Sequence, residues 1–335
     1  MTKEYIKAFH LLGEHLKNEQ VLQGLIEKAF QQNTWFNAEE TGHALRAWSK
    51  LLNEAELSKW LSAYSISTKV PKRVGLILAG NIPMVGFHDV CSVLLSGHMA
   101  CIKLSSQDAV LIPSLLEKLV EIEPRLKAQI EYSERLNHVD AVIATGSNNT
   151  ARYFEYYFSQ KPHIIRKNRN SVAILTGKET NEDFVKLGED IFRYYGQGCR
   201  NVSKLYVPKD YNFSPLLDAL QVYEYVADQS KYYNNYNYYK SIYLVNRETH
   251  LDTGFLLLKE NTSLQAPLSV LFFEYYEEHA ALMKGLQEIE SDIQCIVAKE
   301  SITHTSQVLG FGETQKPGWS DYADGVDTMK FLSEL

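Results

Sequence analysis

From Pro71 onward, short apolar runs alternate with segments of helical spacing. The apolar runs are RVGLILAGN, MACIKLSS and VDAVIATGS, and the helical segments that follow them are FHDVCSVLLSG, IPSLLEKLVEIEP and ARYFEYYFSQ. Strands that are apolar throughout are buried on both faces, which is typical of a parallel sheet covered by helices. The alternation therefore predicts βαβ units and a doubly wound sheet over residues 71–177.

Three further parts flank this region. Residues 1–70 place apolar residues three and four apart, which predicts a helical N-terminal segment without a chemical motif. Residues 178–310 alternate helical and apolar segments again and predict a second α/β domain. Residues 311–335 are rich in glycine and aspartate and end on apolar residues, so we expect this segment to pack back on the body of the protein.

The second domain contains a stretch of unusual composition. Its helices are predicted at 181–195, 214–228 and EHAALMKGLQEI, and its strands at 203–208, SIYLVN, GFLLLKE, PLSVLFFEYY and IQCIVAKE. Tyrosines gather between Gln221 and Tyr243, around YYNNYNYY. Because asparagine favours turns, we interpret this stretch as a partly buried surface loop, with a pocket lining or a subunit contact as alternatives.

Composition excludes several classes of protein. The chain has 335 residues, of which 45% are apolar and 22% charged, as in globular proteins. Its net charge of -7 and its scattered basic residues argue against a nucleic-acid partner. No apolar run reaches the roughly 18 residues of a membrane span and the N-terminus has no signal-peptide core, so we expect a cytoplasmic protein. The four cysteines lack CxxC spacing, which argues against disulfides and against a metal site.

Polar side chains follow three of the predicted strands. Asn81 lies in AGNIPMVG, Lys103 in IKLSS, and Gly146 and Ser147 in ATGS, where a helix begins. Each has an ordinary structural explanation, as a turn former, a solvated strand end or a helix cap. In parallel α/β sheets, however, ligands bind at the carboxyl ends of the strands. His88 in GFHDV is interpreted as a capping or packed histidine, with an acid or a ligand contact as the alternative.

Cys199 lies in YGQGCRNV, after two glycines and between a predicted helix and a predicted strand. An unpaired cysteine is often a small buried hydrophobe. A thiol at a glycine-flanked junction can instead face a cleft that side chains do not fill, which is where a nucleophile would lie.

Together these segments resemble the aldehyde dehydrogenase superfamily, and within it the long-chain acyl-CoA reductases related to the fatty-acid reductase component of bacterial bioluminescence. The resemblance runs from about Pro71 to the C-terminus and rests on AGNIPMVGFHDVCSVLLSG, ACIKLSSQDAVLIP, ATGSNNTARYF, YGQGCRNVSKLYV and DYADGVDTM. It implies an aldehyde dehydrogenase-like α/β fold of two doubly wound domains, preceded by the helical segment. Residues 71–177 would be the dinucleotide-binding domain and 178–310 the catalytic domain.

The resemblance also implies the catalytic roles. Cys199 matches the nucleophile, and Asn81 matches the asparagine whose amide, with the backbone N–H of the cysteine, forms the oxyanion hole. A thiol nucleophile requires a lowered pKa, to which dipoles or a nearby cation can contribute, and Arg200 is adjacent in sequence.

A nicotinamide cofactor is implied by the same comparison. Lys103 matches the lysine that contacts the adenosine ribose, with Ser105 and Ser106 beside it. Gly146 and Ser147 match the turn that approaches the pyrophosphate. Relatives that prefer NAD often carry a glutamate where this chain has Ser106, so a 2′-phosphate would be tolerated here. We therefore expect NADPH, with NADH as the alternative.

Two positions depart from the aldehyde-oxidising pattern. The glutamate that activates water for hydrolysis of the acyl-enzyme is absent, since HIIRKNRN places Ile165 there. The glutamate that holds the nicotinamide ribose is replaced by Ser263, and Glu260 is the carboxylate close to it in sequence. Without a base for water, the acyl-enzyme would survive to be reduced or to exchange with a thiol.

The sequence thus predicts an NAD(P)H-dependent reductase that converts an acyl-CoA or acyl-carrier thioester to an aldehyde through Cys199. The alternatives are a CoA-acylating aldehyde dehydrogenase or an acyl-phosphate reductase on the same fold, and a non-catalytic relative that binds a thioester or a partner protein. The resemblance further implies a homo-oligomer, with a dimer as the first expectation.

Overall fold

A computed structural model describes residues 2–66, 70–300 and 302–335. It divides into two compact units, one formed by the chain up to Asn168 together with Gly318–Leu335, the other by Arg169–Pro317. The expected boundary after residue 177 lies beyond the first strand of the second unit, which begins at Asn170. Residues 67–69, at the end of the expected N-terminal segment, lie outside the described residues.

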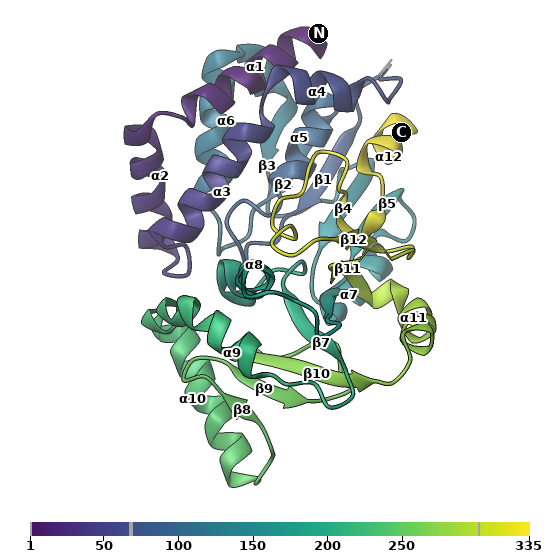
Figure 1. The fold of residues 1–335 in the computed structure, drawn as a ribbon. Helices are drawn as coiled ribbons and strands as arrows, with labels where there is room; N and C mark the ends of the chain where they lie inside the picture. Colours follow the sequence, from purple (N-terminus) through teal and green to yellow (C-terminus); the bar gives the residue numbers. More distant parts are fainter. Residues whose placement is uncertain (1, 67–69, 301) are drawn as a thin grey trace. The chain divides into compact units, whose positions relative to one another are not determined.

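The first unit combines a helical layer with a five-stranded sheet (Figure 1). Its strands are β1 (Arg73–Ile77), β2 (Met99–Lys103), β3 (Ile130–Tyr132), β4 (Ala141–Thr145) and β5 (His163–Arg166). Its helices are α1 (Thr2–His15), α2 (Glu19–Gln32), α3 (Ala38–Leu51), α4 (Glu54–Leu61), α5 (Phe87–Leu95), α6 (Leu111–Ile122), α7 (Asn148–Phe158) and α12 (Thr328–Ser333), with short 3-10 turns at Pro124–Gln129 and Ala323–Gly325.

The strand order β3-β2-β1-β4-β5, with every pairing parallel, confirms the predicted doubly wound sheet. The two faces of each strand enter different cores. Ala100 and Ile102 of β2 face the core formed with α5 and α6, whereas Cys101 faces a smaller core that includes Phe154 and Phe158 of α7. Because both faces are covered, the strands read as continuous apolar runs.

The N-terminal helices belong to the first unit and are not a separate body. Asparagine caps three of them: the side-chain oxygens of Asn18, Asn37 and Asn53 accept backbone N–H bonds in the first turns of α2, α3 and α4. The apolar faces of these helices then share one continuous core with α5, α6 and the sheet. The segment predicted as helical is therefore helical, and it is buried against the sheet domain.

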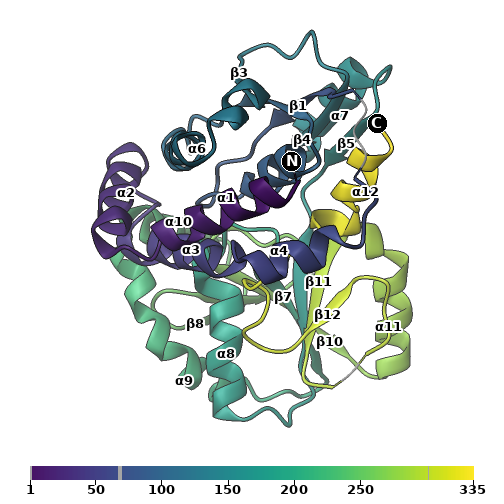
Figure 2. The same cartoon turned by 90° about the horizontal axis from the view of Figure 1, so that it is seen from above.

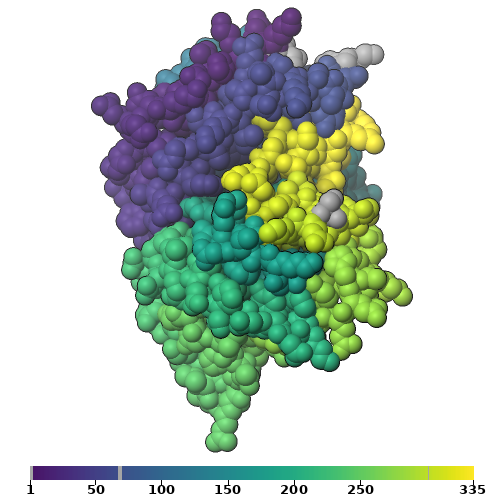
Figure 3. Space-filling view, viewed as in Figure 1, coloured from purple at the N-terminus to yellow at the C-terminus, as the bar shows by residue number. Residues whose placement is uncertain are grey.

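Residues 318–335 return to this unit, as Figure 3 shows for the yellow C-terminal end against the blue helices. Trp319 stacks on Trp60 with ring centroids 4.5 Å apart, and its indole N–H donates to the carbonyl of Leu51. Trp60 in turn donates to the hydroxyl of Tyr322 at 2.7 Å. The chain end thus covers apolar surface of α3 and α4.

The second unit is a seven-stranded sheet of order β12-β11-β6-β7-β10-β9-β8, in which only the β8–β9 pairing is antiparallel among the described strands. In Figure 2, α8 and α11 lie on opposite sides of its strands. The strands are β6 (Asn170–Ile174), β7 (Val202–Pro208), β8 (Leu251–Asp252), β9 (Leu257–Glu260), β10 (Val270–Tyr276), β11 (Ile293–Ala298) and β12 (Gln307–Leu309). The helices are α8 (Asn181–Phe192), α9 (Ser214–Leu220), α10 (Ser230–Val245) and α11 (His279–Glu288), with 3-10 turns η2 (Arg193–Gly196), η3 (Gln221–Asp228) and η4 (Glu290–Asp292).

The tyrosine-rich stretch is helical, so the surface-loop interpretation and the strand predicted at SIYLVN are both wrong. In α10 the buried residues are Tyr232, Tyr236 and Tyr243, and Tyr236 and Tyr243 pack on Leu257 and other residues of β9 and β10. The helix therefore uses phenol rings as its apolar stripe.

The described residues contain neither a membrane-spanning helix nor a cluster of potential metal ligands. No helix within residues 2–66, 70–300 and 302–335 combines the length and apolar character needed to cross a membrane. Over the same residues, no cluster of three or more histidine, cysteine or acidic side chains is arranged to hold a metal ion.

Within the first unit, a buried ion pair joins three elements. Arg166 at the end of β5 pairs with Asp89 of α5 through both carboxylate oxygens and donates to the Thr328 hydroxyl of α12 at 2.9 Å. The side chains of Arg166 and Asp89 are only 6% and 9% exposed. Such a pair stabilises little by itself, but removal of one partner leaves an unpaired charge in the interior.

We therefore predict that Asp89→Ala lowers the free energy of unfolding by about 3–5 kcal/mol, because it leaves the Arg166 guanidinium buried without its carboxylate. Urea denaturation of the two proteins measures the loss. Glu155→Gln is the control, since Glu155 and Lys167 form an ion pair with side chains 46% and 53% exposed, and it should cost less than about 1 kcal/mol. Equal losses in both variants would contradict the prediction.

Candidate active site

The polar residues predicted at strand ends gather at one edge of the first sheet. Asn81 follows β1, Lys103 ends β2, and Gly146 follows β4, and these three strands are neighbours in the order β2-β1-β4. The sheet's strand order reverses direction between β1 and β4, so this edge includes the switch point where doubly wound folds bind ligands.

Asp108 ties the loop after β1 to the loop after β2. Its carboxylate accepts the backbone N–H of Met84 at 2.8 Å and that of Leu111 at 3.3 Å. Met84 has the left-handed φ of 60°, and the bond from Asp108 holds it there. Burial raises the pKa of Asp108 to about 6. The loop that carries Asn81 is therefore fixed by an internal carboxylate.

Gly80 lets the same two loops approach closely. A Cβ at this position would lie 2.4 Å from the hydroxyl oxygen of Ser105, so no larger residue fits without movement of the loop. The Ser105 hydroxyl itself accepts the backbone N–H of Gln107 at 3.2 Å. Asn81 and Ser105 are thus held on loops in direct contact.

The N-terminal helices support the loop after β2. The Gln32 side chain, at the end of α2, donates to the carbonyl of Ser106 and accepts the N–H of Ala109, both at 3.2 Å. Asn33 donates to the carbonyl of Gln107 at 3.2 Å. Lys103 is half-buried and forms no ion pair with any residue of the described chain, so its ammonium remains available for a ligand.

Gly146 and Ser147 form the turn from β4 into α7. Ser147 caps the helix by accepting the N–H of Thr150 at 3.3 Å. A Cβ on Gly146 would lie 3.1 Å from both Thr150 and Phe154, so glycine lets the turn lie against the helix. The first residues of α7 are exposed, which leaves backbone N–H groups at the positive end of the helix facing solvent.

Cys199 lies in the second unit and differs from the other three cysteines in exposure. Cys91, Cys101 and Cys295 are buried, whereas Cys199 is partly exposed, and none forms a disulfide. Burial raises the pKa of all three buried thiols, to about 11 for Cys295. Those thiols are protonated at neutral pH and inaccessible, so among the cysteines Cys199 is the candidate nucleophile.

The backbone before Cys199 makes a left-handed turn. Tyr194, Tyr195 and Gly196 have φ values of 54°, 57° and 75°. Only glycine adopts this conformation at little cost, and each tyrosine there stores about 1–2 kcal/mol. Both tyrosine side chains are buried, which helps to hold the turn.

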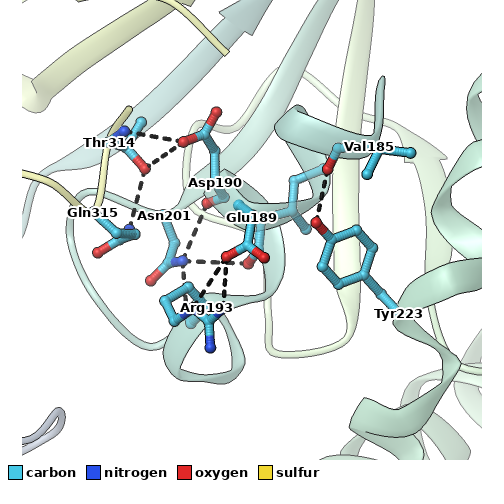
Figure 4. A network of polar contacts seen from close by, with 9 residues as sticks. Val185, Glu189, Asp190, Arg193, Asn201, Tyr223, Thr314 and Gln315 are labelled. Carbon is cyan, nitrogen blue, oxygen red and sulfur yellow. Dashed lines mark hydrogen bonds and ion pairs between the residues drawn. The ribbon is translucent and has the colours of Figure 1, made fainter. Parts of the chain in front are cut away.

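Asn201 fixes the other side of this turn (Figure 4). Its amide nitrogen donates to the carbonyls of Asp190, Ile191 and Arg193 at 3.1, 3.3 and 2.8 Å. Its amide oxygen accepts the N–H of Gly198 at 2.8 Å. The side chain is buried, and it joins the end of α8 to the residue before Cys199.

Neighbouring contacts complete the support of the turn. The Ser171 hydroxyl donates to the carbonyl of Cys199 at 3.0 Å and lies 3.0 Å from the sulfur of Cys295. The Arg200 guanidinium donates to the carbonyl of Thr314 and to the side chain of Gln307. Arg200 is therefore engaged with the segment after β11.

The segment expected near the nicotinamide is held by β7. The Ser203 hydroxyl donates to the carbonyl of Leu264 at 2.8 Å, and the fully buried Lys204 donates to the carbonyl of Thr262 at 2.8 Å and pairs with Glu274. Ser263, between these two anchors, is exposed, and Glu260 is the last residue of β9. At the position where the resemblance implies a glutamate, this chain thus has the short side chain of Ser263, on a loop whose main chain is held at two carbonyls.

Two other sequence expectations can be placed. His88 packs among Trp60, Trp319 and Tyr322, and its Nε2 lies 3.0 Å from the carbonyl oxygen of Trp319, which agrees with the packed-histidine interpretation. Ile165 lies in β5, in the sequence HIIR, so this strand presents no carboxylate.

Comparison with known proteins decides the family. The family model described as acyl-CoA reductase (LuxC) matches residues 36–224, more than half of the chain's 335 residues. The chain belongs to the acyl-CoA reductase (LuxC) family. A long-chain acyl-protein thioester reductase of Aliivibrio fischeri is 25% identical over 183 residues, covering 49% of this chain and 38% of that protein. The chain thus matches well under half of the length of this relative.

Solved structures establish the fold. A putative aldehyde dehydrogenase from Burkholderia cenocepacia superposes with a TM-score of 0.69 at 12% identity, covering 92% of this chain and 79% of that one. Aldehyde dehydrogenase 21 from Physcomitrella patens gives 0.71 at 12%, covering 100% and 84%. The NAD+ complex of an aldehyde dehydrogenase from Bacillus cereus gives 0.64 at 13%, covering 89% and 72%. The predicted aldehyde dehydrogenase-like fold is confirmed.

Sequence reasoning missed the residues that support the site in this family member. Asn201 and Asp108 follow motif residues but carry no pattern of their own, and Gln32 is distant in sequence from the loop it contacts. The signal that was available is local: Asn201 is an amide two residues after the thiol, at a turn flanked by glycine.

The buried carboxyl of Asp108 predicts that the stability of the protein depends on pH. The pKa of Asp108 is raised from 3.8 to about 6 in the folded protein. Between pH 4 and pH 6, roughly, the Asp108 carboxyl loses its proton in the unfolded chain but keeps it in the folded protein. The free energy of unfolding that this group contributes therefore falls as pH rises from about 4 to about 6. The loss should approach about 3 kcal/mol, since one pKa unit is worth about 1.4 kcal/mol.

Urea unfolding at several pH values from 4 to 7 tests this prediction. Asp108→Asn should make the decline in stability less steep over that range, because it removes one of the two carboxyls, Asp108 and Asp190, whose pKa burial raises to about 6. Asp218→Asn, at an exposed position of α9, is the control for removing one carboxylate. A decline of the same steepness in Asp108→Asn and in the wild-type protein would refute the assignment.

Proposed function

We propose that the protein reduces an acyl thioester to an aldehyde, with NADPH as the reductant and Cys199 as the nucleophile. The observation that carries this proposal is the partly exposed Cys199 on a left-handed, hydrogen-bonded turn, in a chain whose other three thiols are buried. Membership of the acyl-CoA reductase family and the name of the Aliivibrio fischeri relative support the same substrate class.

In the proposed reaction the Cys199 thiolate attacks the carbonyl carbon of the substrate thioester. The carbon–sulfur bond to CoA, or to a carrier thiol, then breaks and that thiolate leaves, so the acyl group is carried on Cys199. The Cys199 backbone N–H and the Asn81 amide are the proposed donors to the oxyanion, as the resemblance implies. After reduction the thiohemiacetal gains a proton on oxygen, and its collapse returns the Cys199 thiol and an aldehyde.

The residues at the edge of the first sheet fit a dinucleotide. The exposed N-terminus of α7 offers backbone N–H groups to a pyrophosphate, and Gly146 lets the turn before the helix lie against Thr150 and Phe154. The Lys103 ammonium is available for the ribose or its 2′-phosphate, and Ser105 and Ser106 add hydroxyls without a repelling carboxylate. When bound, NADPH would supply the hydride that reduces the acyl group on Cys199.

Hydrolysis of the acyl-enzyme is disfavoured by the residues present. Ile165 occupies the place of the water-activating glutamate and lies on a strand, HIIR, that holds no carboxylate. An acyl group on Cys199 would therefore persist until it is reduced or transferred to a thiol. This supports reduction over oxidation of an aldehyde to a free acid. A homo-oligomer, most simply a dimer, is proposed from the resemblance alone.

The proposal predicts that the purified protein oxidises NADPH in the presence of acyl-CoAs of graded chain length. Cys199→Ala should lose activity by at least about 1,000-fold, because no other thiol can accept the acyl group. Cys91→Ala is the control, since it removes a buried thiol of α5, in the other unit, and it should retain turnover. Folded protein without turnover on acyl-CoA, on acyl phosphate or on an acyl carrier would refute the reductase assignment.

Cofactor preference gives a second prediction. Lys103→Ala should weaken NADPH binding about tenfold or more and weaken NADH binding less, because one charge-assisted hydrogen bond to the 2′-phosphate is worth about 1.5–3 kcal/mol. Ser106→Glu should shift the preference toward NADH by placing a carboxylate near that phosphate. Fluorescence titration of the apoprotein with each cofactor measures both effects. Unchanged dissociation constants in both variants would show that this loop does not bind the ribose.

A further inference from the structure

Asn201 is a buried, highly connected side chain close to the candidate nucleophile. Its amide nitrogen lies within hydrogen-bonding distance of three carbonyls, at 2.8 to 3.3 Å, which share its two hydrogens, and its amide oxygen accepts one N–H at 2.8 Å. Its side chain is buried, with an exposed fraction of 3%. An amide is the side chain that can satisfy both kinds of partner at once, because it carries two donor hydrogens and an acceptor oxygen.

The partners lie on both sides of the left-handed turn. The three carbonyls come from the last turn of α8 and from Arg193, where the helix leaves backbone acceptors without intrahelical donors. The N–H that Asn201 accepts belongs to Gly198, the residue before Cys199. The backbone N–H of Asn201 also donates to the carbonyl of Gly198 at 3.0 Å. Gly198 is thus held through both its N–H and its carbonyl.

The carbonyl of Gly198 belongs to the peptide bond whose N–H is that of Cys199. Because a peptide unit is planar, fixing that carbonyl also fixes the direction of the Cys199 N–H. The Asn201 side chain holds the preceding peptide, through the Gly198 N–H, and ties it to the end of α8. We infer that Asn201 is a positioning residue, which through its side chain and its backbone N–H holds Gly198 from both sides, so that the thiol and the backbone N–H of Cys199 point to the same reacting carbonyl. The inference rests on the proposed role of Cys199 as nucleophile.

The surroundings of Asn201 separate this role from general support of the fold. Asp190, whose carbonyl accepts from Asn201, uses its carboxylate for the N–H groups of Gly312 and Thr314 at 2.7 and 3.0 Å. Those bonds anchor another segment and do not reach the turn. In Figure 4 Asn201 lies beside Asp190 and Arg193, whereas Tyr223 lies on the other side of Glu189, next to Val185. Tyr223 donates to the carbonyl of Val185 at 2.7 Å.

Asn201→Ala and Tyr223→Phe therefore form a matched pair. Each removes hydrogen bonding to the backbone of α8, but only the first touches the Cys199 loop. In Asn201→Ala we expect hydrogen–deuterium exchange at the Gly198 amide to accelerate at least about tenfold, because that N–H loses its acceptor. In Tyr223→Phe exchange at Gly198 should remain as in the wild-type protein.

The effect on catalysis is measured by comparing the rate of the chemical step with the affinities for the two ligands. With acyl-CoA as the substrate, Asn201→Ala should lower the single-turnover rate of CoA release by about 100-fold or more, since misplaced reacting groups cost this much. Its KM for acyl-CoA and its dissociation constant for NADPH should stay within about threefold. A loss confined to melting temperature, or equal in Tyr223→Phe, would overturn the inference.

Failure of the proposed function is distinguishable from failure of this inference. If the wild-type protein releases no CoA, the reductase proposal fails, and the exchange of Gly198 together with alkylation of Cys199 by iodoacetamide still decides the role of Asn201. Faster exchange and alkylation slowed at least about tenfold in Asn201→Ala alone would sustain it. Exchange and alkylation unchanged from the wild-type protein would overturn it.

Discussion

The second unit depends on one costly backbone reversal between α8 and β7. Tyr194 and Tyr195 adopt left-handed φ values, at about 1–2 kcal/mol each. The two N–H hydrogens and the oxygen of the Asn201 amide make hydrogen bonds worth about 1 kcal/mol each, and their sum is of the same size as this cost. The turn is therefore stable only with its buried amide, and Cys199 occupies the place that the turn creates at the start of β7.

The sequence contained enough information for the sheet of the first unit. Continuous apolar runs separated by helical spacing predict parallel strands, and parallel strands end at one edge, so Asn81, Lys103 and Gly146 could be assigned to that edge before the strand order was known. The closing contacts could not be predicted. Asp108 acts through main-chain N–H groups, and main-chain partners leave no trace in residue identity.

The prediction for the tyrosine-rich helix was wrong for a different physical reason. An amphipathic helix is usually recognised by aliphatic residues on one face and polar residues on the other. Helix α10 instead buries Tyr232, Tyr236 and Tyr243 and exposes other tyrosines, such as Tyr233 and Tyr238. Phenol rings serve on both faces, because the ring is apolar and the hydroxyl is polar. An amphipathic helix made of one residue type shows no contrast in hydropathy, so its pattern resembled a loop rich in asparagine.

Strand β7 connects the two features that most concern the proposed chemistry. It begins three residues after Cys199, and its next residues, Ser203 and Lys204, hold the carbonyls of Leu264 and Thr262. Lys204 is fully buried, and a buried ammonium requires a partner, which Glu274 provides. The segment around Ser263 is therefore held from β7 on both sides of that residue. Its main chain is fixed by the same strand that follows Cys199, and the backbone N–H of Ser263 donates to the side chain of Asn261 at 2.8 Å, so the loop is held at three successive residues.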